Sequence, residues 1–170
     1  TREQYTHAAD AMARIVLRNA FFGFVPGRPR FSKLVLPRTI YTGPELARVG
    51  STAAELEARG VAFQTLEVAL EENDRARLDG DGGLLRVHLT PGLRGGRILG
   101  ATLVSAHAGE SLPLLTTAMV EGIPLQRLAR VIHAYPTQAE AIKRAADRFY
   151  TERLRGLREL LFHPSRWWRI

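Results

Sequence analysis

The stretch LLRVHLTPGLRGGRILGATLVS, Leu84 to Ser105, decides the fold class, because two β-rich arms flank a glycine-rich turn. In the first arm the apolar residues at 85, 87 and 89 alternate with Arg86 and His88. This period of two is typical of a strand with one buried and one solvated face. Pro-Gly and Gly-Gly between the arms favour a tight antiparallel connection. We therefore predict a β-hairpin whose Arg86 and His88 face water.

Two further strand-like segments lie upstream of the hairpin. Residues 34–42 (LVLPRTIYT) and 61–70 (VAFQTLEVAL) are rich in β-branched and aromatic side chains. Pro37 suits an edge strand or a bulge. Both segments are expected to join the same antiparallel sheet.

Helical and connecting segments separate these strands. GPELARVGS (43–51) is predicted to form a short turn of helix. TAAELEARG (52–60) is predicted to be a helix, since Thr52 and Glu55 have capping-box spacing and Gly60 ends it. EENDRARLDG (71–80) is expected only to lead the chain out of the second strand.

From Ala108 onward the pattern is helical, in AGESLPLLTTAMVEG, PLQRLARVI, PTQAEAIKRAADRFY and TERLRGLRELLF. Strands followed by helices predict an α+β domain, with an antiparallel sheet of about four to five strands and helices packed on one side. One further helix over 5–22, which Thr6 could cap, precedes it, and a Gly/Pro-rich linker follows that helix. We expect three parts: 1–30, 31–150 and 151–170.

Composition excludes several classes of function. The chain has 170 residues and a net charge of +7, but 22 of its 24 basic residues are arginines dispersed among 17 acids, which argues against a nucleic-acid partner. No apolar run approaches the ~20 residues of a membrane span, and the first residues do not form a signal peptide. The absence of cysteine excludes disulfides and thiolate metal sites, and is compatible with the cytoplasm. No phosphate-binding glycine motif, paired metal-binding histidines or serine-hydrolase elbow occurs, so no metal site is predicted.

The segment IHAYPTQAE (132–140) has the densest polar chemistry in the chain. In a structural interpretation, Thr137 caps the following helix and Glu140 completes a capping box. In a functional interpretation, the phenol of Tyr135 and the carboxylate of Glu140 form part of an active site at the mouth of that helix. Periodicity alone does not separate the two.

Four segments together resemble the C-terminal part of the flavin-dependent pyridine nucleotide–disulfide oxidoreductases, which include dihydrolipoamide dehydrogenase, glutathione reductase and mercuric reductase. THAADAMARIVLRNAFF is similar to the last helix of their FAD domain, and YTGPELARVG to the start of their dimerisation domain. RILGATLVSAHAGE resembles their G-x-x-[LIV]-[LIV]-G-x-x-A-x-E segment, and HAYPTQAE occupies the place of H-x-H-P-T-x-x-E. The resemblance covers nearly the whole chain and implies the dimerisation-domain fold.

The resemblance assigns roles within HAYPTQAE. In the disulfide-reducing members the second histidine is the acid–base partner of the redox disulfide on the other subunit, and the glutamate orients it. Glu140 matches that glutamate, and His133 matches the first histidine, which is not the acid–base group. Tyr135 stands where the acid–base histidine is expected, and a phenol with a pKa near ~10 is a poor proton shuttle beside an imidazole near ~6.5. Mercuric reductases are similar in having tyrosine there, although they also carry a C-terminal cysteine pair that HPSRWWRI lacks. The resemblance further implies a cis Tyr135–Pro136 bond.

The resemblance also implies cofactors and partners. Thr6 and His7 match positions whose backbone lies beside the flavin of the parent enzyme, while the NAD(P)H site and the redox CxxxxC are expected upstream of Thr1. The chain alone is therefore expected neither to hold FAD tightly nor to turn over, but to pair with a second copy. The interface candidates are Leu112, Leu115 and Met119 and the stretch after Leu125, with plain core packing as the alternative. The tail from Arg153 to Ile170, with Trp167 and Trp168, is expected either to pack across the dimer or to be exposed.

Three questions stay open on the sequence alone. One is whether the chain acts within an enzyme, as a stand-alone dimerising scaffold, or as a basic nucleic-acid-binding module. The others are the identity of the electron acceptor and the choice between NADH and NADPH.

Overall fold

The computed structural model describes residues 4–92 and 95–161, and the chain divides into two compact units, Thr1–Leu36 and Pro37–Ile170. The first unit holds the helix α1 (Thr6–Phe22) and the 3-10 turn η1 (Phe31–Lys33). The predicted helix is confirmed, but Thr6 does not cap it. Tyr5, in extended backbone, is the N-cap, and its carbonyl accepts the first helical bond from Ala9, so Thr6 already lies in the first turn. The predictions for Trp167 and Trp168 fall outside the described residues.

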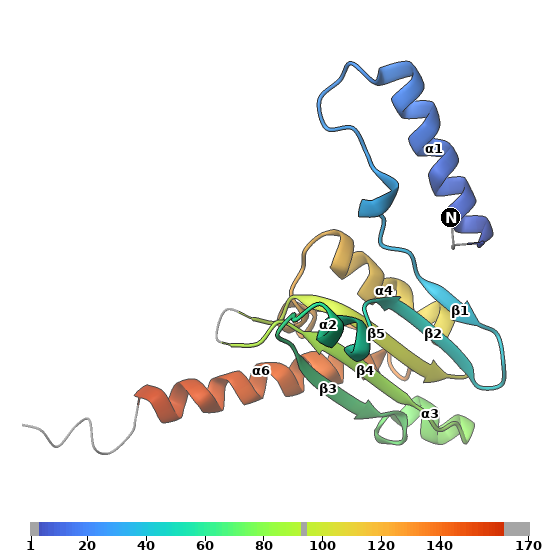
Figure 1. The fold of residues 1–170 in the computed structure, drawn as a ribbon. Coiled ribbons are helices and arrows are strands. Elements are labelled where there is room, and N and C mark those ends of the chain that lie inside the picture. Colours follow the sequence, from blue (N-terminus) through green and yellow to red (C-terminus); the bar gives the residue numbers. More distant parts are fainter. Residues whose placement is uncertain (1–3, 93–94, 162–170) are drawn as a thin grey trace, which may run out of the picture. The chain divides into compact units, whose positions relative to one another are not determined.

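The second unit is built on a five-stranded antiparallel sheet (Figure 1). Its strands lie in the order β1-β2-β5-β4-β3. Their bounds are β1 (Arg38–Ile40), β2 (Glu45–Gly50), β3 (Gln64–Ala69), β4 (Leu84–Leu89) and β5 (Ile98–Ser105). The predicted hairpin of β4 and β5 is confirmed and contributes two central strands, because β5 pairs with β2 on its other side.

One face of this sheet forms the core. The register places apolar side chains from four strands on that face, and all are at most 8% exposed: Ala47, Val49, Leu66, Val68, Leu85, Val87, Ala101 and Leu103. The helices α4 (Ala108–Val120) and α6 (Glu140–Leu161) lie behind the sheet in Figure 1, against β2 and β5 and against β3 respectively. The short helix α5 (Leu125–Leu128) packs on α6. The α+β class and the antiparallel sheet of about four to five strands are therefore confirmed.

Two of the interface candidates on α4 belong to this core. Leu112 and Leu115 are 1% and 0% exposed within one chain, so their side chains cannot also form a dimer surface. Met119 is half-buried. The expectation of an interface on the apolar face of α4 is wrong for these two leucines, because that face packs on the sheet.

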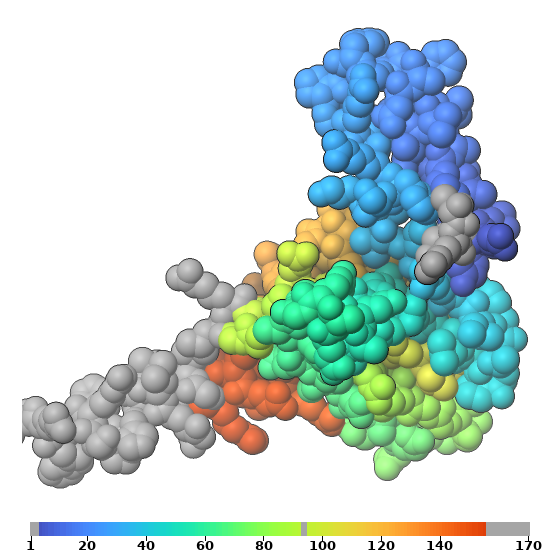
Figure 2. Space-filling model, in the orientation of Figure 1, coloured from blue at the N-terminus to red at the C-terminus, as the bar shows by residue number. Residues whose placement is uncertain are grey.

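The other face of the sheet carries the short helix α2 (Ala53–Ala58), which lies in front of it in Figures 1 and 2. The predicted capping box of Thr52 and Glu55 is present, with bonds of 3.2 and 2.9 Å. Gly100 lets residue 51 approach the strand, since a Cβ there would lie 1.9 Å from the Ser51 carbonyl oxygen.

His88 is not solvated as predicted. Its ring is 4% exposed, meets the Phe63 ring edge-on at 5.3 Å, and lies 2.9 Å from the Thr65 hydroxyl. Arg86, on the same face, is exposed as predicted. The alternation in the sequence therefore identified the face, but not the segment after α2 that covers part of it.

The segment GPELARVGS forms a strand rather than a helical turn. Its residues 45–50 are β2, which pairs with β1 on one side and β5 on the other. Ala47 and Val49 are buried and their neighbours are not, which is the burial pattern of a half-buried strand. Pairing on both edges outweighs the weak local preference for helix.

A second difference is the helix α3 (Asp74–Asp79), preceded by the turn η2 (Leu70–Glu72), where the sequence predicted only a connection. The side chain of Asn73 caps α3 by accepting a 3.1 Å bond from the Ala76 amide, and Gly80 ends it at φ 70°. The start and end of such a short helix between strands are determined by its capping residues rather than by a hydrophobic period.

Two polar contacts connect helices to the sheet. The Glu45 carboxylate of β2 accepts a 2.8 Å bond from the Gly109 amide in the first turn of α4, where negative charge is favourable. Arg148 of α6 donates to the main-chain carbonyl of Glu67 in β3 and to the carboxylate of Glu72, both at 2.8 Å. In residues 4–92 and 95–161 we find no helix with both the length and the hydropathy of a membrane span.

Candidate functional site

The turn that leads into α6 carries Tyr135, His133 and Glu140. Glu140 is the first residue of α6, and its Oε2 accepts a 3.4 Å bond from the Thr137 amide. The Thr137 hydroxyl donates instead to the Ala134 carbonyl at 2.8 Å. The predicted capping box is therefore half formed: the glutamate performs its part, but the threonine side chain stabilises the preceding turn.

Tyr135 projects its phenol from this turn toward α3. The residue is 70% exposed, and its hydroxyl donates a 3.0 Å hydrogen bond to Oδ2 of Asp74. This hydrogen bond, together with the negative charges of Asp74 and, to a smaller extent, Glu140, raises the pKa of the Tyr135 phenol. The Tyr135–Pro136 bond is cis, as the resemblance implied. The phenol is thus accessible, oriented and protonated at neutral pH.

Two more side chains fasten the turn to α3. Asn73, 1% exposed, donates from its amide to the Thr137 carbonyl at 3.0 Å, while its oxygen caps α3. Gln138, 7% exposed, donates to Oδ2 of Asp81 at 2.8 Å at the far end of α3. Hydrogen bonds therefore fasten the turn to residues at both ends of α3, which lies more than fifty residues earlier in the sequence.

His133 has a different environment. Its Nδ1 lies 3.1 Å from the Val131 carbonyl, which accepts only, so Nδ1 carries the proton when the ring is neutral. Nε2 is then an acceptor, and it is buried without a hydrogen-bond partner in the described part of the chain. No hydrogen bond found there joins it to Tyr135 or Glu140. The structure therefore brings His133 into the same turn but not into the same polar network.

Thr6 and His7 lie in the other unit, at the N-terminus of α1. Both are exposed, and the His7 ring stacks on Tyr5 with centroids 5.4 Å apart and planes 19° apart. Their amides belong to the first turn of α1, where main-chain N–H groups have no helical acceptor.

Exposed apolar side chains surround Tyr135 in sequence. Ile132 is 95% exposed and Val131 is 39% exposed, on the stretch after Leu125 that was expected to contact a second copy. Leu125 and Leu128 themselves are buried. The free apolar surface therefore begins where α5 ends, and we call residues 131, 132 and 135 the turn surface.

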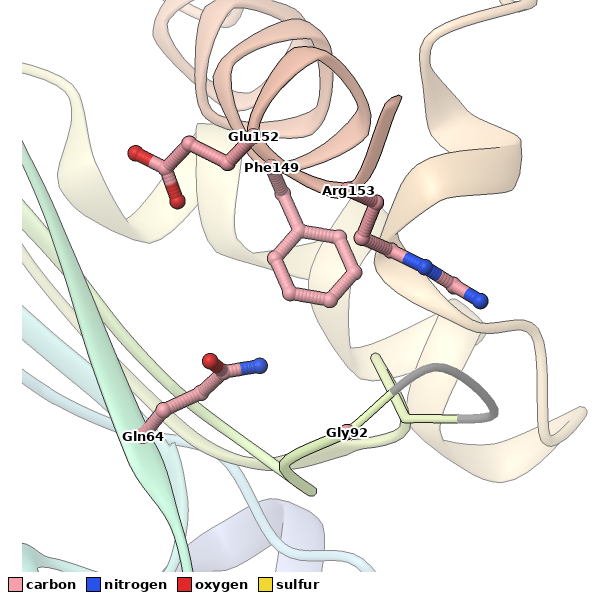
Figure 3. Close-up of a pocket in the computed structure, with 5 residues that line it drawn as sticks. All are labelled: Gln64, Gly92, Phe149, Glu152 and Arg153. Atoms are coloured by element: carbon pink, nitrogen blue, oxygen red, sulfur yellow. The ribbon is translucent and has the colours of Figure 1, made fainter. Parts of the chain in front are cut away.

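A concavity lies beside the start of β3 (Figure 3). Its volume is about 270 Å³, and it is lined by Gln64, Gly92, Phe149, Glu152 and Arg153. Arg153 lies over the Phe149 ring at 5.8 Å, and Glu152 points to the opposite side of that ring. The charged groups do not converge on one point, so we assign it no chemistry. The described residues also contain no cluster of three or more side chains suited to hold a metal ion.

Sequence reasoning singled out Tyr135 and Glu140 as candidates but did not identify the residues that hold their turn. Asn73, Asp74 and Asp81 all lie in EENDRARLDG, which was expected to be a simple connection. The Asn-Asp pair followed by a glycine six to seven residues later is a cap signal for a short helix and could have revealed α3. No local pattern could have paired it with the turn at 135.

Comparison with known proteins agrees with this architecture. Residues 36–146 match the family described as the pyridine nucleotide-disulphide oxidoreductase dimerisation domain. A mercuric reductase of Streptomyces lividans is 33% identical over 149 residues, 87% of this chain and 30% of its own length. A dihydrolipoyl dehydrogenase of Trypanosoma brucei brucei is 37% identical over 121 residues, 71% of this chain and 24% of its own length.

Solved structures give the same result. LpdA from Mycobacterium tuberculosis superimposes with a TM-score of 0.71 and 26% identity, over 82% of this chain and 29% of its own. The HOCl-induced flavoprotein disulfide reductase RclA of Escherichia coli supports the fold, with a TM-score of 0.74 and 24% identity over 86% of this chain and 33% of its own. The chain thus spans no more than 33% of the length of these four relatives. With a family match over more than half its residues, the chain belongs to the dimerisation-domain family of the pyridine nucleotide-disulphide oxidoreductases.

Proposed function

We propose that this chain is the homodimerisation domain of a flavin-dependent NAD(P)H oxidoreductase and that it contributes Tyr135 and Glu140 to the active site of the partner subunit. The observation that carries this proposal is the presentation of Tyr135. Its phenol is 70% exposed, yet it is held by Asp74 on a turn fastened to α3. An exposed aromatic residue that is also positioned is suited to act on a group outside its own chain.

The turn surface supports a second copy as partner. Ile132 is almost fully exposed and sits three residues from Tyr135, so an apolar contact there would bring the phenol to the subunit boundary. A two-fold interface uses the same patch on both chains, and each chain would then complete the other's site.

The parent chemistry follows from the family. We propose that the parent binds FAD and NAD(P)H, that residues 1–30 end its FAD domain with Thr6 and His7 beside the flavin, and that residues 31–150 form the dimerisation domain. Residues 151–170 would then be the C-terminal segment, which starts within α6 (Glu140–Leu161). A helix N-terminus such as that of α1 suits the electron-rich edge of a flavin. A cytoplasmic location is proposed from the cysteine-free composition.

Tyrosine in place of the acid–base histidine favours a mercuric-reductase-like parent. The similarity to the Streptomyces lividans mercuric reductase over 87% of this chain supports that choice. The phenol is a weak acid here, because Asp74 and Glu140 raise its pKa, so ordinary disulfide reduction is not the favoured reaction.

Sedimentation of the 170-residue chain at low micromolar concentration tests the association. We expect a dimer. A monomer at all concentrations up to the solubility limit would contradict self-association by this domain.

The active-site role is tested in the longer protein that contains this domain. Tyr135→Phe should slow reduction of the electron acceptor but leave reduction of the flavin by NAD(P)H unchanged. Tyr150→Phe is the matched control, because Tyr150 is also an exposed tyrosine of this domain but lies on α6 outside the turn. Equal acceptor reduction in wild type and Tyr135→Phe would show that the phenol has only a structural role.

A further inference from the structure

We propose that Asp74 is the positioning residue of Tyr135. Its carboxylate accepts a hydrogen bond from the phenol O–H and so fixes the ring. Tyr135 then presents a neutral oxygen, with its lone pairs available, to the partner subunit. The inference rests on the proposed function, because it specifies how the tyrosine presented across the dimer is held and in which form it acts.

The first support is that Asp74 is itself fixed. It is the first residue of α3, and the preceding Asn73 is buried and bonded in two directions, to the Ala76 amide and to the Thr137 carbonyl. Two hydrogen bonds therefore join the start of α3 to the turn before α6: one from Asn73 to Thr137, and one from Tyr135 to Asp74. A carboxylate on this rigid base restricts the phenol more than a mobile surface acid would.

The second support is that the neighbouring cation is engaged elsewhere. Arg75 forms a two-point contact with Asp79, at 2.7 Å from Nε to Oδ2 and 2.6 Å from Nη2 to Oδ1. This pairing one turn along the helix engages Arg75, the cation next to Asp74 in sequence, and the Asp74 carboxylate accepts the phenol O–H. A carboxylate already matched to a guanidinium would have held the hydroxyl less strongly.

The third support is the balance of charge at the phenol. Asp74 and Glu140 both act on it, and both disfavour the phenolate; desolvation acts in the same direction, and these effects together raise the pKa of Tyr135. With the O–H directed to Asp74, the oxygen can only accept from, or donate a lone pair to, a further group. Tyr135 thus serves as an orienting acceptor and not as a proton source, which an imidazole in its place would be.

Titration of Tyr135 in the intact 170-residue chain tests this arrangement. The chain has four tyrosines, so ring-labelled tyrosine gives four NMR signals, and Tyr135→Phe identifies the one to follow. We expect the titration midpoint of Tyr135 to fall in Asp74→Ala, which removes both bond and charge. In Asp74→Asn, which keeps an acceptor but loses the charge, we expect a smaller fall.

Asp147→Asn is the matched control, since it makes the same change of charge in the same unit. Its carboxylate binds Lys143 at 2.7 Å and is not among the charges that act on Tyr135. A midpoint that stays unchanged in both Asp74 variants, or that falls equally in Asp147→Asn, would overturn the role of Asp74.

Sedimentation of the same variants separates this inference from the proposed function. A midpoint that falls while the chain remains a dimer supports both. A wild-type monomer contradicts the proposed function, whereas an unchanged midpoint in a stable dimer contradicts only the role of Asp74.

Discussion

At the scale of single residues, the rings of Tyr135 and His88 lie in contrasting environments. Tyr135 is exposed and its hydroxyl donates a hydrogen bond to the Asp74 carboxylate, whereas His88 is buried in the sheet and bonds to no carboxylate among the described residues. Burial, and to a smaller extent the charge of Arg86, lowers the pKa of His88; Glu67 opposes this weakly. The neutral imidazole is therefore part of the folded state.

The lowered pKa of His88 predicts how stability depends on pH. The unfolded chain binds this proton more tightly, so the contribution of neutral His88 is complete above the unfolded pKa of about 6.5 and is lost as the pH falls through the folded value. Denaturant unfolding of wild type and His88→Gln between about pH 7.5 and pH 5 should therefore show a steeper loss of stability in the wild type. His107→Gln, which removes an exposed histidine, is the control. Parallel curves for wild type and His88→Gln would contradict this account.

At the scale of elements, caps determine where the short helices form. The capping box of α2 was predictable from Thr52 and Glu55, because both of its members lie within four residues. The strand β2 was not predictable from ELARVG, because its partners are provided by β1 and β5, the latter more than fifty residues away. Local signals were sufficient for the start of α2, whereas distant pairing decided the strand.

Loss of the α2 cap should have a moderate cost. Thr52→Ala is expected to lower the free energy of unfolding by about 1 kcal/mol, because the Glu55 amide loses its acceptor. Thr117→Ala, at an exposed position inside α4, should change stability little or increase it slightly, since alanine is the better helix former. Urea unfolding of both variants measures the difference, and equal effects would show that the cap contributes nothing of its own.

The junction of α3 with the turn should be more sensitive. Asn73→Ala removes the cap of α3 and leaves the Thr137 carbonyl without its donor, so a loss of about 2 kcal/mol is expected. Asn73→Ser keeps a capping oxygen but cannot reach Thr137, and should lose roughly half as much. If the serine variant is as unstable as the alanine variant, the bond to Thr137 and not the cap is the main contribution.

At the scale of the whole molecule, the apolar face of α4 belongs to the core of the second unit. That face was a candidate for both core and interface, and the structure assigns Leu112 and Leu115 to the core. Sequence periodicity finds an apolar face but does not tell whether a sheet of the same chain or a second chain covers it. The turn surface around Ile132 is one of the exposed apolar areas that a partner could contact, and Tyr41, Leu78 and Val120 are exposed as well.

A pair of substitutions distinguishes the two areas. Leu115→Ala should destabilise each subunit by about 3 kcal/mol, since it opens a cavity in a fully buried site. Ile132→Asp should leave the unfolding of the single chain within about 0.5 kcal/mol of wild type. It should also weaken the dimer by about tenfold or more, as measured by sedimentation. Unchanged dimer affinity in Ile132→Asp would place the interface elsewhere.

One of the two edge strands, β3, also bears on how copies of the chain could meet. β3 ends the sheet order, and strands in that position recruit strands from other molecules and so begin aggregation. Here Arg148 donates a hydrogen bond to the main-chain carbonyl of Glu67, and its guanidinium also forms an ion pair with the Glu72 carboxylate. An incoming strand would have to displace this arginine from both partners before it could pair there. Sheet extension along β3 is thereby discouraged, so pairing of strands from two copies is disfavoured at this one of the two sheet edges.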